Sequence, residues 1–232
     1  MLKPIKFTRP DGRTANGVIA EAQQALGAVV VLQEWWGVNA QICGVAERLA
    51  AAGFTALVPD LYRGKSTVEQ EEAHHLMEAL NFGDAAANDV RGAVQYLKSL
   101  NLGSGKVGIT GYCMGGALTW LALMNTPEAD AGVVWYGLPP LEYLDASKLT
   151  QPVMAHWATQ DAAFSIDNVD RLEPLLREAQ VRYEGHRYHA HHAFANEDAQ
   201  GPKRIAITQY DAVWARMAWD RTLRFFGQHL TA

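Results

Sequence analysis

Short apolar runs alternate with longer amphipathic segments along most of the chain. Six runs rich in branched, aromatic or alternating apolar residues predict strands, at 28–32, 54–59, 106–110, 131–136, 153–157 and 182–188. Apolar residues at helical spacing predict helices at 40–52, 68–80, 84–100, 116–124 and 168–179, and a terminal helix with at most one break over 205–230. Strands separated by helices of this length imply right-handed crossovers. We therefore expect an α/β fold, a mainly parallel, doubly wound sheet with helices on both faces.

Composition narrows the class of protein. The chain has 232 residues, 49% of them hydrophobic, which suits a single α/β domain spanning 1–232. A net charge of -5 and a pI near 5.9 give no electrostatic footprint for nucleic acid, and no basic run indicates membrane binding. The beginning of the chain lacks a secretory leader pattern, and no apolar run reaches membrane-spanning length. These features predict a cytoplasmic protein, a monomer or small homo-oligomer, with a small-molecule partner.

The pentapeptide 111–115, Gly-Tyr-Cys-Met-Gly, carries the strongest chemical signal. It follows a predicted strand and precedes a predicted helix, which is the setting of a nucleophile elbow. Glycines two residues before and after the nucleophile avoid a collision as the strand folds back into the helix. The start of the helix would favour the thiolate form of Cys113. The alternative for this pattern alone is a small buried cysteine at a tight turn. The other cysteine, Cys43, lies on a predicted core helix, and we expect it to be structural.

Two further strand ends carry groups that could serve such a nucleophile. Asp161 follows the strand at 153–157, and imidazoles follow the strand at 182–188. The chain order of nucleophile, acid and histidine is that of α/β-hydrolases. Asp161 could instead be a turn or capping aspartate. The histidines could hold a metal, but no second ligand cluster and no Cys-x-x-Cys pair accompanies them, so we expect no metal and no cofactor. The histidines in question are His186, His189, His191 and His192.

The loop at 33–39, after the first buried strand, is where an oxyanion hole is expected. In this arrangement the hole uses the backbone N–H of the residue after the nucleophile, Met114, and one from this loop, that of Trp35. Glu34 is an unusual neighbour for a thiol, because a carboxylate there either raises the thiol pKa or accepts its proton. The alternative is a surface glutamate paired with a basic side chain.

With these segments in view, the chain resembles the dienelactone hydrolase family (carboxymethylenebutenolidases), cysteine-using members of the α/β-hydrolase fold. The resemblance covers nearly the whole chain and rests on segments at 33–39, 59–62, 105–108, 111–116, 156–164 and 192–194. It implies that Cys113 is the nucleophile, His192 the general base and acid, and Asp161 the carboxylate that orients the histidine. It also implies that Glu34 is the hydrogen-bond partner of the resting thiol.

The sequence departs from that family where the substrate is held. Dienelactone-cleaving members hold a substrate carboxylate with two arginines, and Gln70 and Asn196 stand at those positions here. An amide does not replace the charge of a guanidinium. Arg63, Lys65 or His74 could compensate. Substrate contacts are expected from Trp36, Tyr136, Asn196 and Arg63, within a group of aromatic residues at strand ends that could equally belong to the core.

The function expected from these residues is hydrolysis of an ester or lactone through a Cys-His-Asp triad and a thioester acyl-enzyme. Two alternatives stay open. The chain could be a non-catalytic ligand-binding protein of the same fold, or a thiol redox sensor that uses Cys113.

Overall fold

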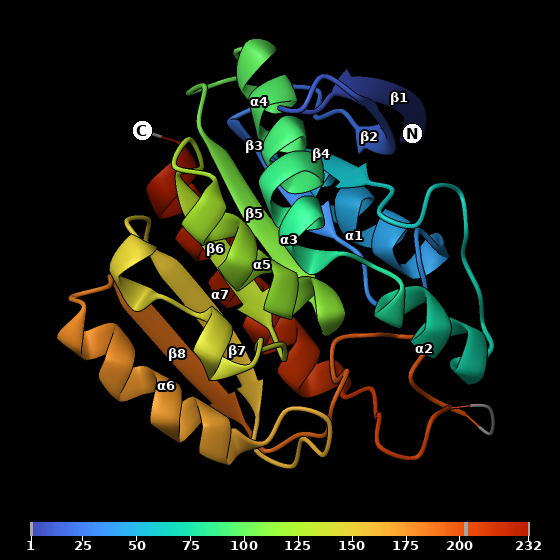
Figure 1. The fold of residues 1–232 in the computed structure, drawn as a ribbon, viewed down its shortest axis with the longest axis vertical. Helices are drawn as coiled ribbons and strands as arrows, with labels where there is room; N and C mark the ends of the chain where they lie inside the picture. Colours follow the sequence, from blue (N-terminus) through green and yellow to red (C-terminus); the bar gives the residue numbers. More distant parts are fainter. Residues whose placement is uncertain (1, 202–203, 232) are drawn as a thin grey trace.

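The described residues fold around one sheet with helices on both faces (Figure 1). The structure is a computed structural model, and it describes residues 2–201 and 204–231. The strands are β1 (Leu2–Thr8), β2 (Thr14–Ala20), β3 (Gly27–Leu32), β4 (Phe54–Pro59), β5 (Val107–Tyr112), β6 (Ala131–Trp135), β7 (Val153–Ala158) and β8 (Tyr183–Tyr188). The main helices are α1 (Ala40–Ala51), α2 (Gln70–Glu78), α4 (Arg91–Ser99), α5 (Met114–Asn125), α6 (Ile166–Glu178) and α7 (Ala212–Leu230). Shorter helical segments are α3 (Phe82–Asp84), the π-helical η1 (Ala85–Val90), and the 3-10 turns η2 (Leu141–Tyr143) and η3 (Ala146–Lys148).

The strand order of the sheet is β1-β2-β4-β3-β5-β6-β7-β8. The pairs from β4 through β8 are all parallel, and only β2 runs antiparallel to its neighbours β1 and β4. This confirms the predicted mainly parallel sheet. The carboxyl ends of the parallel strands meet along one edge, where loops carrying chemistry converge.

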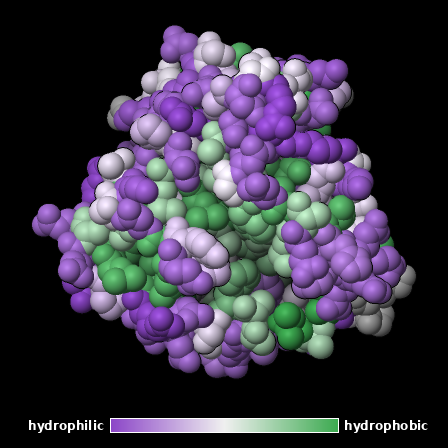
Figure 2. All heavy atoms as spheres, in the orientation of Figure 1, coloured by the Kyte–Doolittle hydropathy of each residue, from purple (hydrophilic) through white to green (hydrophobic). Residues whose placement is uncertain are grey.

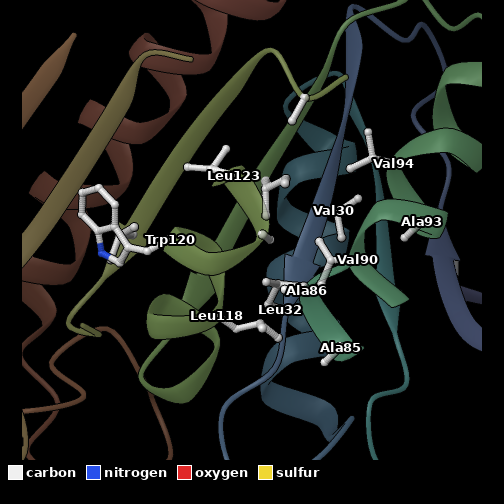
Figure 3. Packing of buried hydrophobic residues seen from close by; sticks show 14 of the residues in the cluster. Val30, Leu32, Ala85, Ala86, Val90, Ala93, Val94, Leu118, Trp120 and Leu123 are labelled. Atoms are coloured by element: carbon white, nitrogen blue, oxygen red, sulfur yellow. The ribbon is translucent and has the colours of Figure 1, made fainter. Parts of the chain in front are cut away.

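Alternate side chains of β3 enter two separate cores. Val30 and Leu32 lie in the core under α4 and α5, as Figure 3 shows for Val30 beside Val90 and Leu32 near Leu118. Val29 and Val31 lie in the opposite core, with α1 and α7. The β3 side chains are buried on both faces, which explains why this strand has a continuous apolar sequence rather than an alternating one.

The N-terminal hairpin was not predicted by the apolar pattern. β1 and β2 pair in antiparallel register from Leu2 opposite Ala20 to Thr8 opposite Thr14. Both strands lie toward the edge of the sheet, and most positions of β1 are exposed. The turn nevertheless carries a recognisable signal, Pro10-Asp11-Gly12, with Gly12 at φ 82°. The signal for this hairpin therefore lies in its turn.

The predicted helix over 205–230 is wrong at its beginning. Helix α7 starts at Ala212, because the side chain of Asp211 caps the amides of Val213 and Trp214. The segment before it pairs with other loops instead of winding into a helix. Its amides bond to the carbonyl groups of His192, Ala199 and Phe194.

Candidate active site

Cys113 lies in the sharp connection between β5 and α5. Its backbone adopts φ 54° and ψ -117°, a region that non-glycine residues rarely occupy. Gly115 packs against the preceding β3 segment so closely that a β-carbon would lie 2.5 Å from the carbonyl oxygens of Leu32 and Gln33. A β-carbon on Gly137 would lie 2.0 Å from the carbonyl oxygen of Cys113. The glycines therefore allow the close backbone packing that holds Cys113 in this conformation.

The structure brings the three predicted triad residues together. Nε2 of His192 is 3.1 Å from Sγ of Cys113, and Nδ1 is 2.8 Å from Oδ2 of Asp161. The other carboxylate oxygen of Asp161 accepts the N–H groups of Ala163 and Phe164 at 2.7 and 2.8 Å. Asp161 is thus fixed by its own loop and presents one oxygen to the imidazole.

The loop that carries His192 is anchored by the segment before α7. His192 and Thr208 form an isolated parallel bridge, in which the amide of Gln209 donates to the carbonyl of His192 at 3.0 Å. The amide of Asp211 donates to the carbonyl of Phe194 at 3.0 Å. These bonds are distant in sequence, and the apolar pattern gave no sign of them.

The charged surroundings favour the imidazolium form of His192. Burial of the ring disfavours its charged form, but the sulfur of Cys113 and the carboxylate of Asp161 outweigh burial. Together they hold the pKa of His192 well above its ordinary value. The imidazole of His192 is therefore held toward its protonated form, with Nδ1 facing Asp161 and Nε2 facing Cys113.

Glu34 is buried beside this group and has other hydrogen-bond partners than the thiol. Its Oε1 accepts the hydroxyl of Tyr136 at 3.3 Å, and its Oε2 accepts the side-chain amide of Asn196 at 2.8 Å. The thiol of Cys113 instead faces His192. Burial raises the pKa of Glu34, against the opposing effects of the imidazole and of these two hydrogen bonds.

Tyr136 has a positive φ of 37°, directly after β6. This conformation lets its ring lie edge-on to His192, with the ring centroids 5.2 Å apart, while its hydroxyl reaches Glu34. Burial, together with the neighbouring carboxylate, raises the pKa of Tyr136 well above its ordinary value, so the phenol remains a donor. Tyr136 therefore belongs to the surroundings of Glu34.

Of the two residues proposed for the oxyanion hole, Met114 directly follows the nucleophile. Met114 is the first residue of α5, where backbone N–H groups have no partner within the helix. Trp35 lies in the loop after β3, and that loop is tied to the one after β4 by a bridge between Gly37 and Ser66. Tyr62, one of the aromatic residues at strand ends that the sequence suggested could line a pocket or belong to the core, follows β4 and donates its hydroxyl to Sδ of Met114 at 3.2 Å.

An open cavity of about 440 Å³ lies next to Trp35. Its lining residues are Trp35, Gln70, Glu71 and His74, so helix α2 forms one wall. Gln70 and Trp35 therefore line the same cavity. Trp36 stacks edge-on against Trp35, with the ring centroids 5.0 Å apart.

Arg63 is engaged elsewhere. Its guanidinium forms two hydrogen bonds with the buried carboxylate of Asp89, at 2.9 and 2.8 Å, and a third with the carbonyl of Asp60. Asp89 also accepts a hydrogen bond from the guanidinium of Arg9, the residue that follows β1. The guanidinium of Arg63, a candidate for substrate binding, is therefore bound to Asp89 instead.

The histidines near the end of β8 do not gather into a metal site. His186 pairs with Glu184, and His191 with the carbonyl of Gln160. Within residues 2–201 and 204–231, no group of three or more His, Cys, Asp or Glu side chains is placed to hold a metal ion. Over the same residues, no helix has the length and apolar character needed to cross a membrane.

Comparison with known proteins places this geometry in a family. The profile of the Dienelactone hydrolase family matches residues 15–230. The chain is 32% identical to "Protein usf" of Aquifex pyrophilus over 235 residues, covering 98% of each chain. It is 30% identical to the "Putative carboxymethylenebutenolidase" of Aquifex aeolicus over 234 residues, covering 97% of this chain and 98% of the relative.

A solved structure gives the same result for the fold. The crystal structure of a "Putative Dienelactone Hydrolase" from Klebsiella pneumoniae superposes with a TM-score of 0.82 at 27% identity, covering 99% of this chain and 100% of the other. The eight-stranded, mostly parallel sheet with its helices is therefore an α/β-hydrolase fold, as the sequence predicted. The matched residues, the shared fold and the elbow at the end of β5 together show that this chain belongs to the dienelactone hydrolase family.

Proposed function

We propose that this protein hydrolyses a small ester or lactone through Cys113, by way of a thioester acyl-enzyme. One observation carries the proposal. A single imidazole, that of His192, contacts both the sulfur of Cys113 and the carboxylate of Asp161, at 3.1 and 2.8 Å. A nucleophile, a general base that contacts it and an acid that orients the base form an arrangement that enzymes use for acyl transfer.

In the first half-reaction the Cys113 thiolate attacks the carbonyl carbon, and the carbonyl electron pair moves to the oxygen. The N–H groups of Met114 and Trp35 stabilise that oxyanion. The oxyanion collapses, the carbon–oxygen bond to the alcohol breaks, and the imidazolium of His192 protonates the departing oxygen. The product of this step is a thioester on Cys113.

In the second half-reaction neutral His192 takes a proton from water, which attacks the thioester carbonyl. Collapse of the second tetrahedral intermediate releases the acid and the Cys113 thiolate, and His192 is left as imidazolium beside Asp161. A thiolate is a better leaving group than an amine, so esters and lactones suit this nucleophile better than amides. This proposed chemistry requires no metal and no cofactor.

Glu34 is proposed as a second proton-accepting group near the sulfur. Burial raises its pKa, which brings the carboxylate closer to the range in which it can exchange a proton at neutral pH. Its oxygens are held by Tyr136 and Asn196, and Sγ of Cys113 faces His192. Transfer of a proton from Cys113 to Glu34 would therefore require the thiol to rotate away from the imidazole.

The test compares wild type with Cys113→Ala on two substrates, a dienelactone and a neutral aryl ester, with both proteins at the same folded concentration. Turnover of at least one substrate that disappears in Cys113→Ala supports the proposal. Equal rates in the two proteins, or no turnover, refute it.

Alkylation of Cys113 by iodoacetamide then separates the two other functions. Fast labelling without any ester, in a protein that turns over neither substrate, would indicate a thiol sensor. Absence of both labelling and turnover would indicate a non-catalytic ligand-binding protein. Labelling that accelerates when an enol lactone is added would support catalysis gated by the substrate.

A further inference from the structure

The cavity beside Trp35 has an acidic wall. Four residues line it, Trp35 from the loop after β3 and Gln70, Glu71 and His74 from α2, and the only acidic side chain among them is that of Glu71. Glu71 is exposed, in the first turn of the helix. With the N–H of Trp35 as the proposed oxyanion donor, this cavity would hold a part of the substrate attached to the reacting carbonyl.

The acidic character extends along the helix. Between Lys65 and Arg91 the sequence has no lysine or arginine, while α2 and the residue before it carry Glu69, Glu71, Glu72 and Glu78. Figure 2 shows hydrophilic side chains over α2 at the lower right, next to apolar side chains that gather toward the middle of the same face. A carboxylate entering here would meet like charge and no guanidinium.

The cationic and amide groups near this cavity have other neighbours, and Lys65 lines a separate cavity with Asn16 and Asp60. His74 faces the carboxylate of Glu78, at 3.3 Å. Arg63 is paired with Asp89, and the amide of Asn196 is bonded to Glu34. Gln70 is in the cavity but contributes a neutral amide.

We propose that this cavity selects esters whose acyl group is uncharged or cationic, and that Glu71 is the residue that discriminates against anionic acyl groups. The inference rests on the proposed hydrolase function. The indole of Trp35 accepts a short alkyl chain, and Glu71 repels a carboxylate at the far end of that chain while tolerating or attracting an ammonium group there.

Three 4-nitrophenyl esters of matched length test the proposal: the pentanoate, the glutarate monoester and the 4-(trimethylammonio)butanoate. Release of 4-nitrophenolate is followed for wild type, with Cys113→Ala as the background. We expect kcat/KM for the neutral and cationic esters to exceed that for the anionic ester by roughly tenfold or more. The reason is the repulsion between two like charges that meet near the protein surface. Equal or preferred turnover of the glutarate monoester overturns the inference and leaves the hydrolase function standing.

Two variants and a control locate the effect. Glu71→Gln should raise kcat/KM for the anionic ester several-fold with little change for the neutral one, and Gln70→Arg should raise it further. Glu178→Gln, which removes an exposed charge of the same kind from the last turn of α6, should leave the ratio near the wild-type value. An unchanged ratio in Glu71→Gln refutes the role of Glu71. Absence of Cys113-dependent turnover of all three esters refutes the proposed function itself, and the inference with it.

Discussion

Gly111 packs against Gly115 so closely that a β-carbon on Gly111 would lie 2.1 Å from the carbonyl oxygen of Gly115. Gly111→Ala should therefore push the end of β5 away from the start of α5. A backbone oxygen cannot move aside as a flexible side chain can, so we expect a loss of about 2 kcal/mol or more of unfolding free energy. Urea unfolding measures it.

The matched control is Gly44→Ala. Gly44 lies inside α1, and a β-carbon there would meet no atom within 4 Å. Alanine favours the helix, so this variant should gain up to about 1 kcal/mol. A similar loss in both variants would show that the close packing at the elbow has no special energetic role.

Asp161→Asn should lower kcat by about 10²- to 10⁴-fold while the protein stays folded. The asparagine carbonyl can still accept the amides of Ala163 and Phe164, which leaves its NH₂ group facing Nδ1 of His192. That donor stabilises the wrong tautomer and no longer supports the imidazolium. Steady-state kinetics on the best ester give kcat, and near-UV circular dichroism checks the fold. A loss below tenfold would remove Asp161 from the mechanism.

Glu34→Gln should stabilise the protein at neutral and alkaline pH. The pKa of Glu34 is raised in the folded state, so the unfolded chain releases this proton at a lower pH than the folded chain does. The stability contributed by Glu34 is full below the ordinary glutamate pKa of about 4.3, and it declines as pH rises toward the raised value. Over that window the slope is about 1.4 kcal/mol per pH unit.

The measurement is the difference in Tm between Glu34→Gln and wild type from pH 4 to pH 8. The difference should grow as pH rises, because glutamine has no charge to bury. Tyr136 can turn its hydroxyl to accept the new NH₂ group, so the local hydrogen bonds survive. A difference that stays constant with pH would contradict a raised pKa of Glu34.

Arg9→Met should destabilise the protein by about 3 to 5 kcal/mol. Arg9 is 3% exposed and binds the carboxylate of Asp89, which is 1% exposed, so its removal leaves a buried charge with less compensation. Arg63→Met removes a partner that is 47% exposed and should cost less. Chemical unfolding gives both values.

Kinetics on the same pair of variants addresses substrate binding. The guanidinium of Arg63 is bonded to Asp89 in the wild type. Arg63→Met should therefore leave KM for a neutral ester within about twofold of the wild-type value. A large rise in KM without loss of stability would return Arg63 to the substrate site, as the sequence first suggested.

The helices and the parallel strands were predictable because their apolar residues are continuous or periodic. The continuous apolar runs of β3 and β4 are typical of strands that are buried on both faces. The residues of the proposed triad follow strand ends, where the loops of a parallel sheet come together. The chain order of nucleophile, acid and histidine pointed to Cys113, Asp161 and one of the histidines after β8, and the family resemblance selected His192 among them.

Other features depend on contacts between distant parts of the chain, which leave no periodic trace. The segment before α7, predicted as helix, is a loop because it pairs with the loop that carries His192, through Thr208. The hydrogen-bond partners of Glu34 come from two other loops. The sequence could suggest that Glu34 and Cys113 lie near each other. It could not tell which of the neighbouring donors each of them would bind.

The bonds between the His192 loop and the segment before α7 bear on the thermodynamics of substrate binding. The amides of Gln209, Tyr210 and Asp211 all donate within this pair of segments, so their protons should exchange slowly with solvent, even in the free protein. Hydrogen-exchange rates should then change little when a substrate analogue binds. The ordering entropy of the proposed base, His192, has then already been lost during folding, and a ligand meets a site that it does not have to organise.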